Sequence, residues 1–348
     1  MLRILIEVLF MKFCSKKTRL CLYRLKKKRT RCHLKRRTTR KRHIFRRRYN
    51  IVRNNILQQR VSTGEIKQIV APASFNISKN ADAVLSFFDE VKLCLEKSIP
   101  IKIITKNITE LSVDTLLYLI AIMQDAKENG YIYHVEGDLP ENEFCKKIFQ
   151  SSGFFKYVRS KNSTLQVTDN SVLHITSGTK HDPQHIKKLC EFIQNKLCIK
   201  RTDTRYIFTA ITELMQNTIG HAYPHKSQKD SWFLFASFNG DNNSIDIAFL
   251  DTGVGIPATV RKNFVERIEK MLIKNDSGLI MSALRGHFRT QTNLKSRGKG
   301  LPSVYNRLID GSFSDFTLIS NYGYIYNETE NNLSHKLMGT LYSWRIKK

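Results

Sequence analysis

The sequence predicts an α/β (α+β) protein with more than one domain behind a basic tail. Three observations lead to this prediction: a length of 348 residues, short apolar runs that alternate with amphipathic helical patterns, and a very uneven charge distribution. A chain of this length exceeds an ordinary single domain. We therefore expect a tail over residues 1–60, a first domain over 65–175 and a second over 180–348.

The positive charge is concentrated at the start of the chain. Residues 1–60 contain 22 Lys and Arg residues and one acidic residue, Glu7, within a chain whose net charge is +28. Dense like charges repel one another and favour disorder. Phe45 and Tyr49 lie among them, and aromatic rings can stack on unpaired bases. We expect residues 15–60 to contact polyanions in a salt-dependent way, and a dedicated role in binding RNA or DNA is an alternative.

Cysteine usage and hydropathy favour a cytoplasmic protein. The chain has seven cysteines, an odd number, and none of them forms a CxxC pair. The first 13 residues are apolar, but they include Arg3 and Glu7 and are too few to cross a bilayer. We expect neither a signal peptide nor a membrane span.

The first domain alternates strands with helices, the pattern of an α/β unit with crossover connections. The helix expected over 81–97 has an apolar stripe that includes Val84, Phe88 and Val91. The remaining elements are expected as strands over 66–70, 101–105 and 131–135 and as helices over 113–129 and 141–151.

This order of elements resembles the STAS-type domain of anti-sigma-factor antagonists. The resemblance centres on the strand, turn and helix of residues 101–115, where that family often carries a phosphorylatable Ser or Thr. Here Asp114-Thr115 is followed by Leu116 and Leu117, so the Asp-Ser-Ser-Gly run of the family is missing. We expect Thr115 to be an ordinary residue in the first turn of its helix.

The second domain is predicted to be a layered arrangement of helices and strands. Helices are expected over 183–200, 203–222, 258–284 (with a break near 276–278) and 301–310, and strands over 232–238, 244–250, 315–320, 323–327 and 338–346. The strand over 244–250 alternates polar and apolar residues.

Three polar residues recur at a spacing of four in the helix over 203–222. Glu213, Asn217 and His221 therefore project from nearly the same helical face. The amide oxygen of Asn217 suits Mg²⁺, which takes few protein ligands and keeps several waters. Glu213 could orient or deprotonate a water molecule, or could be a solvated carboxylate. His221 could contact phosphate or could cap the helix.

A glycine-containing turn follows the strand over 244–250. Asp251 ends this strand, where its carboxylate can accept a hydrogen bond from an exocyclic amine. Gly253 and Gly255 allow the backbone to approach a flat ring without Cβ clashes. Ile256 and Pro257 would form a wall of the site.

A second glycine turn precedes the helix over 301–310. Gly298 and Gly300 flank Lys299, and amides at a helix N-terminus favour phosphate. The polar stretch 285–299 is expected to be a lid that brings basic side chains towards the phosphates, namely Arg285, Arg289, Arg297 and Lys299.

Taken together, these motifs resemble the GHKL ATPases, which share the Bergerat ATP-binding fold. Glu213-x3-Asn217-x3-His221 resembles the N box of the family, and Asp251-x-Gly253-x-Gly255 resembles its first glycine box. The run Arg297-Gly298-Lys299-Gly300-Leu301 resembles its second glycine box.

The resemblance implies an α/β sandwich with a mixed sheet that binds ATP and Mg²⁺. It places Asp251 on the adenine amine and Asn217 on the metal, and the anti-sigma-factor kinase branch is the most similar. Three functions stay open: an ATPase that switches contacts with a protein partner, a Ser/Thr protein kinase of the anti-sigma type, and a nucleic-acid-binding protein that uses ATP only as a ligand. A homodimer is possible for this class.

Overall fold

The computed structural model describes residues 51–158, 169–221, 231–273, 275–288 and 300–348, without the side chains of 220, 221, 266, 267 and 270. The chain divides into a unit that ends at Thr63 and a compact unit over Gly64–Lys348. In the first unit, residues 51–62 form a helix, whereas the sequence analysis placed residues up to 60 in a disordered tail. Between 51 and 62 the basic residues are Arg53 and Arg60 alone, so the repulsion expected of the tail is weak here.

The first half of the compact unit contains a small parallel sheet of order β1-β3-β5 and a two-stranded parallel sheet, β2-β4. Its strands are β1 (Lys67–Val70), β2 (Ser74–Phe75), β3 (Ile101–Ile104), β4 (Glu110–Leu111) and β5 (Val135–Gly137). Its helices are α3 (Ala81–Glu96), α4 (Val113–Glu128) and α5 (Glu143–Ser151).

The second half is built on a five-stranded sheet of order β6-β7-β8-β10-β9. Its strands are β6 (Val172–Gly178), β7 (Trp232–Asn239), β8 (Ser244–Asp251), β9 (Ser314–Tyr326) and β10 (Thr329–Lys347). All four strand pairings are antiparallel, which corrects the mixed sheet expected from the family resemblance. Short connections between β7 and β8 and between β9 and β10 explain two of these pairings, because a hairpin joins only antiparallel strands.

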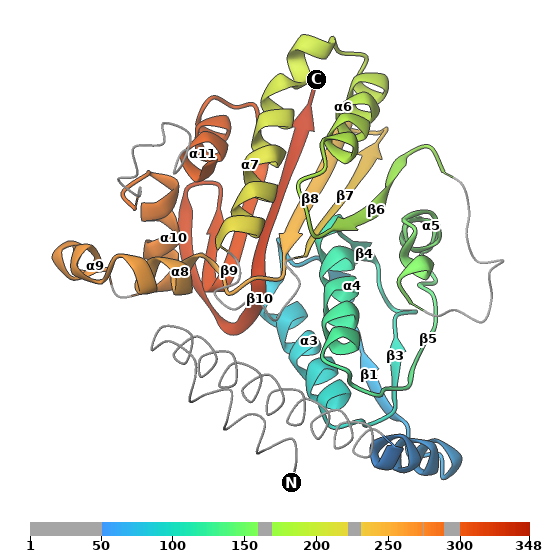
Figure 1. The fold of residues 1–348 in the computed structure, drawn as a ribbon. Coiled ribbons are helices and arrows are strands. Elements are labelled where there is room, and N and C mark those ends of the chain that lie inside the picture. Colours follow the sequence, from blue (N-terminus) through green and yellow to red (C-terminus); the bar gives the residue numbers. More distant parts are fainter. Residues whose placement is uncertain (1–50, 159–168, 222–230, 274, 289–299) are drawn as a thin grey trace, which may run out of the picture. The chain divides into compact units, whose positions relative to one another are not determined.

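Helices cover both faces of this sheet (Figure 1). One face packs against α6 (Pro183–Leu197), α7 (Arg205–His221) and α11 (Gly300–Ile309), and the other packs against α3 and α4. Side chains of β7 alternate between the two cores: Trp232 and Leu234 face one, and Phe233 and Phe235 face the other. Since successive strand residues point to opposite faces, a strand buried on both sides must be apolar throughout.

The ranges 65–175 and 180–348 therefore share one hydrophobic core. Phe88 and Tyr118, from α3 and α4, belong to the same buried cluster as Phe235 of β7 and Leu341 of β10. Polar contacts join the same two ranges, because the Tyr324 hydroxyl donates to the Ser78 carbonyl oxygen over 2.6 Å.

Most long elements lie where the sequence predicts them, and the differences concern short or interrupted ones. The strand expected over 131–135 is β5, shifted to Val135–Gly137, and β6 was not predicted. The helix expected over 258–284 is divided into α8 (Ile256–Asn263), α9 (Val265–Met271) and α10 (Asp276–Leu284). The two strands expected between 315 and 327 form the single strand β9. Gly323 does not interrupt it, because a side chain there would collide with the start of α10, 2.5 Å from Ile280 Cδ1.

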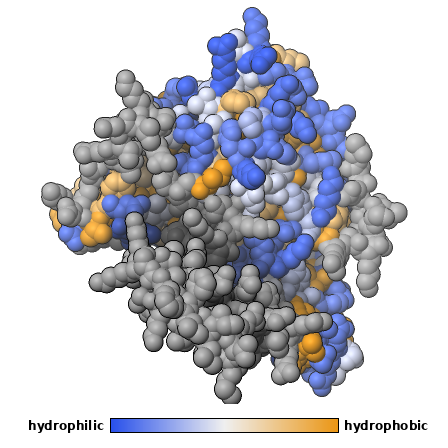
Figure 2. Space-filling view, viewed as in Figure 1, coloured by the Kyte–Doolittle hydropathy of each residue, from blue (hydrophilic) through white to orange (hydrophobic). Residues whose placement is uncertain are grey.

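The surface is largely hydrophilic in the view of Figure 2, with apolar residues at the left edge, where Figure 1 places α9. Val265, Met271 and Leu272 are the exposed apolar residues of this segment. No helix within the described residues is long and apolar enough to cross a membrane.

Candidate functional site

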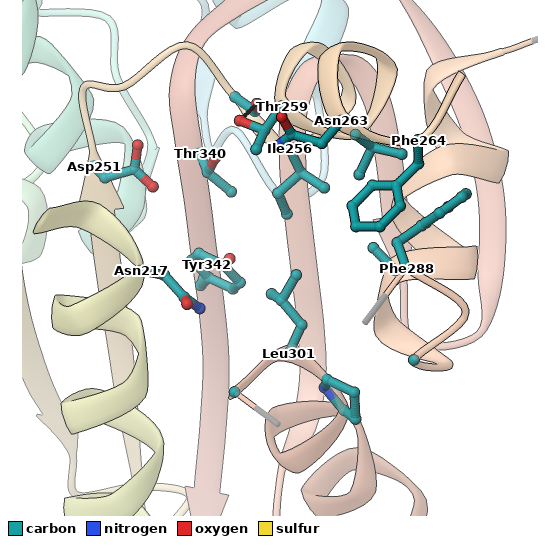
Figure 3. A pocket seen from close by; sticks show the side chains of 16 residues that line it. Asn217, Asp251, Ile256, Thr259, Asn263, Phe264, Phe288, Leu301, Thr340 and Tyr342 are labelled. Atoms are coloured by element: carbon teal, nitrogen blue, oxygen red, sulfur yellow. Dashed lines mark hydrogen bonds between the residues drawn. The ribbon is translucent and has the colours of Figure 1, made fainter. Parts of the chain in front are cut away.

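A pocket of about 160 Å³ opens between α7, the end of β8, α8 and the start of α11. Six of the sequence-predicted site residues line it: Asn217, Asp251, Gly255, Ile256, Gly300 and Leu301. They come from three segments that are well separated in the chain. In Figure 3, Asp251 and Asn217 lie on one side of the pocket and two phenylalanines lie on the opposite side. The fold thus brings the three motifs to one cavity.

Asp251 is the buried carboxylate of this pocket, with 8% of its surface exposed. Burial raises its pKa to about 7, against the opposing effect of hydrogen bonds from the Gly253 backbone and the Thr340 hydroxyl. The Gly253 N–H donates to Asp251 Oδ1 over 2.8 Å. Gly253 therefore holds the carboxylate in place rather than lining the pocket itself.

The turn after β8 depends on Gly255, whose φ is +90°. A Cβ atom at this position would lie 2.7 Å from Asn321 Oδ1 and 2.9 Å from Ser320 Oγ. The next residue, Ile256, begins α8 and donates its N–H to Ser320 Oγ over 2.9 Å. Glycine is thus required both by the backbone angle and by the approach to β9.

The second glycine turn meets α7 at Gly300, the first residue of α11. A Cβ atom on Gly300 would lie 2.9 Å from Glu213 Oε2 and 3.1 Å from Asn217 Nδ2. Both side chains are half-buried, and burial raises the pKa of the Glu213 carboxyl. The N-terminus of α11 therefore lies directly against the polar face of α7, and the amides of a helix N-terminus are suited to an anion.

The far wall of the pocket is apolar and was only partly foreseen. Ile256, Val260 and Asn263 of α8 line it at helical spacing, and the rings of Phe264 and Phe288 lie beside them with centroids 5.5 Å apart. The repeat of residues at spacings of three and four in 256–263 is the signal that could have identified this wall. Pro257 is buried but does not line the pocket, whereas Pro302 does.

Two residues of β10 complete the floor between these walls. Thr340 and Tyr342 both line the pocket, as alternate residues of a strand do when they share a face. Neither was identified from the sequence, because a β-strand in the final 20 residues of a chain carries no motif that marks it as part of a site.

Several residues expected at the site either lie outside the described residues or do not line the pocket. The side chain of His221 and residues Arg289, Arg297, Gly298 and Lys299 lie outside the described residues. Arg285 is exposed at the end of α10 and does not line the pocket. Glu213 does not line it either, but it lies beside Gly300, which does. Within the described residues there is no group of three His, Cys, Asp or Glu side chains that could hold a metal ion.

Thr115 in the first half of the unit is completely buried. It accepts a hydrogen bond from the Ile77 N–H over 2.8 Å, and it lies in the first turn of α4 beside the buried Asp114. Its hydroxyl is thus a structural acceptor in the interior, as the sequence analysis expected of an ordinary helix residue.

No protein-family model matches this chain, and the search of curated proteins found no match either.

Proposed function

We propose that this protein is a Mg²⁺-ATP-binding regulatory protein of the GHKL class that acts as an ATPase-type conformational switch. The observation that carries the proposal is the convergence of Asn217, Asp251, Gly255, Gly300 and Leu301 on one pocket. These residues were selected from the sequence as parts of three separate motifs. Convergence of all three is not expected if each motif has an independent structural role.

The shape and polarity of the pocket support an adenine-type ligand. Apolar side chains of α8 and Leu301 line the space opposite Asp251, a slot suited to a flat ring. A buried carboxylate that keeps few partners gains from a ligand amine that donates to it. Asp251 would therefore accept from the exocyclic amine of the base, and ring stacking on the apolar wall would add burial.

The opposite end of the pocket fits phosphate and a metal ion. The start of α11 presents backbone amides beside Gly300, and Asn217 lies next to it. Asn217 would contribute its amide oxygen to Mg²⁺, whose other ligands would be phosphate oxygens and water. Glu213, in contact distance of the same glycine, would orient a water molecule for attack on the terminal phosphate.

Isothermal titration calorimetry with ATP and Mg²⁺ tests the proposal. The full-length protein is expected to bind, Asp251→Asn and Asn217→Ala are expected to lower the affinity by about tenfold or more, and the exposed Gln216→Ala on the same helix serves as the matched control. Absence of binding by the wild-type protein, or equal binding by all variants, would refute it.

Incubation with γ-labelled ATP then identifies the reaction. Release of labelled phosphate that is lost in Glu213→Gln supports hydrolysis. Label on the protein or on a partner instead supports the kinase alternative, and Thr115 is not an acceptor that such a kinase could reach in the folded chain.

A further inference from the structure

An irregularity in β10 lies between the pocket and the first half of the unit. The pairing of β10 with β9 passes from Leu337–Asn321 to Thr340–Ser320, so Met338 and Gly339 form a bulge that has no counterpart on β9. Bulged residues leave ladder groups unpaired and require another partner.

The partner of the bulge is supplied by helix α4. The Met338 N–H donates to the hydroxyl oxygen of Tyr118 over 2.9 Å. Tyr118 is completely buried, and its ring is held edge-on against Phe88 with centroids 4.9 Å apart. Burial raises the pKa of this hydroxyl, the positive charge of Lys92 of α3 opposes that rise, and Lys92 is itself paired with Asp89 over 2.6 Å.

The other side of the bulge rests on the backbone of Asp251. Gly339 has a φ of +85°, and a Cβ atom there would lie 1.8 Å from the Asp251 carbonyl oxygen. The next residue, Thr340, pairs with Asp251 in the sheet, and its hydroxyl opposes the rise that burial causes in the pKa of the Asp251 carboxyl. The Gly339 carbonyl also accepts from Ser320 Oγ over 3.1 Å, the same oxygen that accepts from the Ile256 N–H.

We propose that Tyr118 is a positioning residue for the pocket, which fixes the Met338–Gly339 bulge and through it the carboxylate of Asp251 and the turn that begins α8. The proposal rests on the proposed function where it concerns nucleotide, and on geometry alone where it concerns the bulge. It assigns a role at the base end of the pocket to a residue of the first half, which does not line the pocket itself.

The test compares Tyr118→Phe with Tyr324→Phe in the full-length protein. Each change removes one hydroxyl that bonds the two halves of the unit, but the Tyr324 hydroxyl donates to the Ser78 carbonyl oxygen rather than bonding the bulge. A variant that acts only through general stability should behave like this control.

Amide hydrogen exchange without ligand measures the positioning directly. The Gly253 N–H donates a hydrogen bond to Asp251 Oδ1. We expect this amide to exchange about fivefold faster in Tyr118→Phe than in the wild type, and at the wild-type rate in Tyr324→Phe. Equal exchange of the Gly253 amide in both variants and the wild type would overturn the proposal, whether or not the protein binds ATP.

Nucleotide selectivity provides the second readout. Inosine triphosphate lacks the exocyclic amine that Asp251 would bind, so a displaced carboxylate should reduce the ratio of ATP to inosine triphosphate affinity by about fivefold in Tyr118→Phe. A uniform loss for both nucleotides would indicate a merely structural role for Tyr118. If the wild-type protein binds neither nucleotide, the proposed function fails, and the exchange experiment still decides the role of the tyrosine.

Discussion

Gly300 of α11 lies against Glu213 of α7 so closely that a β-carbon on the glycine would come within 2.9 Å of a carboxylate oxygen. The two residues belong to motifs separated by more than 80 positions, and their contact lies beside Asn217 at one end of the pocket.

Gly300→Ala is expected to lower the affinity for Mg²⁺-ATP by about tenfold while costing on the order of 1 kcal/mol of stability. The added methyl group displaces the ends of the Glu213 and Asn217 side chains, which can rotate, so the fold should tolerate it. Calorimetry with ATP and urea unfolding measure the two effects. Gly240→Ala is the control, since its nearest neighbour would be 3.7 Å away, and a loss of affinity in that variant would contradict the steric explanation.

Gly339→Ala should instead destabilise the folded protein severely. Its φ of +85° is unfavourable for alanine, and its β-carbon would lie 1.8 Å from a backbone oxygen that cannot move aside. We expect a loss of roughly 3 kcal/mol or more in the free energy of unfolding, measured with urea.

Gly311→Ala separates these two contributions. Gly311 has a similar φ of +75°, but no atom lies within 4 Å of the added carbon. The substitution should therefore lower the free energy of unfolding by only about 1 kcal/mol. Similar losses in the two variants would show that the contact with Asp251 is not what requires glycine at position 339.

The titration of Asp251 predicts a pH dependence of stability. Its pKa rises from 3.8 in the unfolded chain to about 7 in the folded protein, so the folded state holds an extra proton between these values. Stability contributed by the protonated carboxyl is therefore complete below about pH 4 and is lost as the pH rises towards 7. The free energy of unfolding of the wild type relative to Asp251→Asn should fall by on the order of 4 kcal/mol between about pH 4 and pH 8.

The same titration predicts the opposite trend for ligand binding. Only the ionised carboxylate accepts from an amine at both oxygens, so the affinity for ATP should rise through about pH 7 in the wild type. In Asp251→Asn the affinity for ATP should change with pH only through the titration of the ATP phosphates. Parallel pH profiles of ATP affinity in the two proteins would exclude Asp251 as the group that binds the adenine amine.

Thr115→Val should cost about 1–3 kcal/mol of stability, because the buried Ile77 N–H would lose its acceptor. Urea unfolding measures the loss, and the exposed Thr109→Val, whose hydroxyl bond to the Ala73 carbonyl is long at 3.3 Å, should change stability by less than about 0.5 kcal/mol. If Thr115→Val leaves stability unchanged yet abolishes the transfer of label from ATP to the protein, the Thr115 hydroxyl is a phosphoryl acceptor rather than a structural group.

The sequence predicted the polar half of the pocket well because its chemistry depends on residue types at fixed spacing. Asn217 and Glu213 share a helical face, and Asp251 and Gly255 share a turn, so local geometry nearly determines them. The apolar half depends on tertiary contacts: Phe264 meets Phe288 only because α10 folds back onto α8. Such contacts leave no local pattern.

The same distinction explains the differences in fold. α3 and α4 have long periodic patterns and begin and end within about one residue of prediction. β6 is short and mixes His174, Thr176 and Ser177 with its apolar residues, so its alternation is visible only once β7 is paired with it. Two tight hairpins make the β7–β8 and β9–β10 pairings antiparallel, and the mixed sheet that the family resemblance implied is wrong for the described pairings.

The alternating burial of β7 restricts how this protein can be divided. A fragment that begins near residue 180 would expose Phe233, Phe235 and Leu341 to water on a face that α3 and α4 cover in the intact chain. Such a surface promotes association between copies. Fragments for crystallisation or binding assays should therefore begin near residue 64, and a chain truncated between the halves should be recovered as aggregate rather than as an isolated domain.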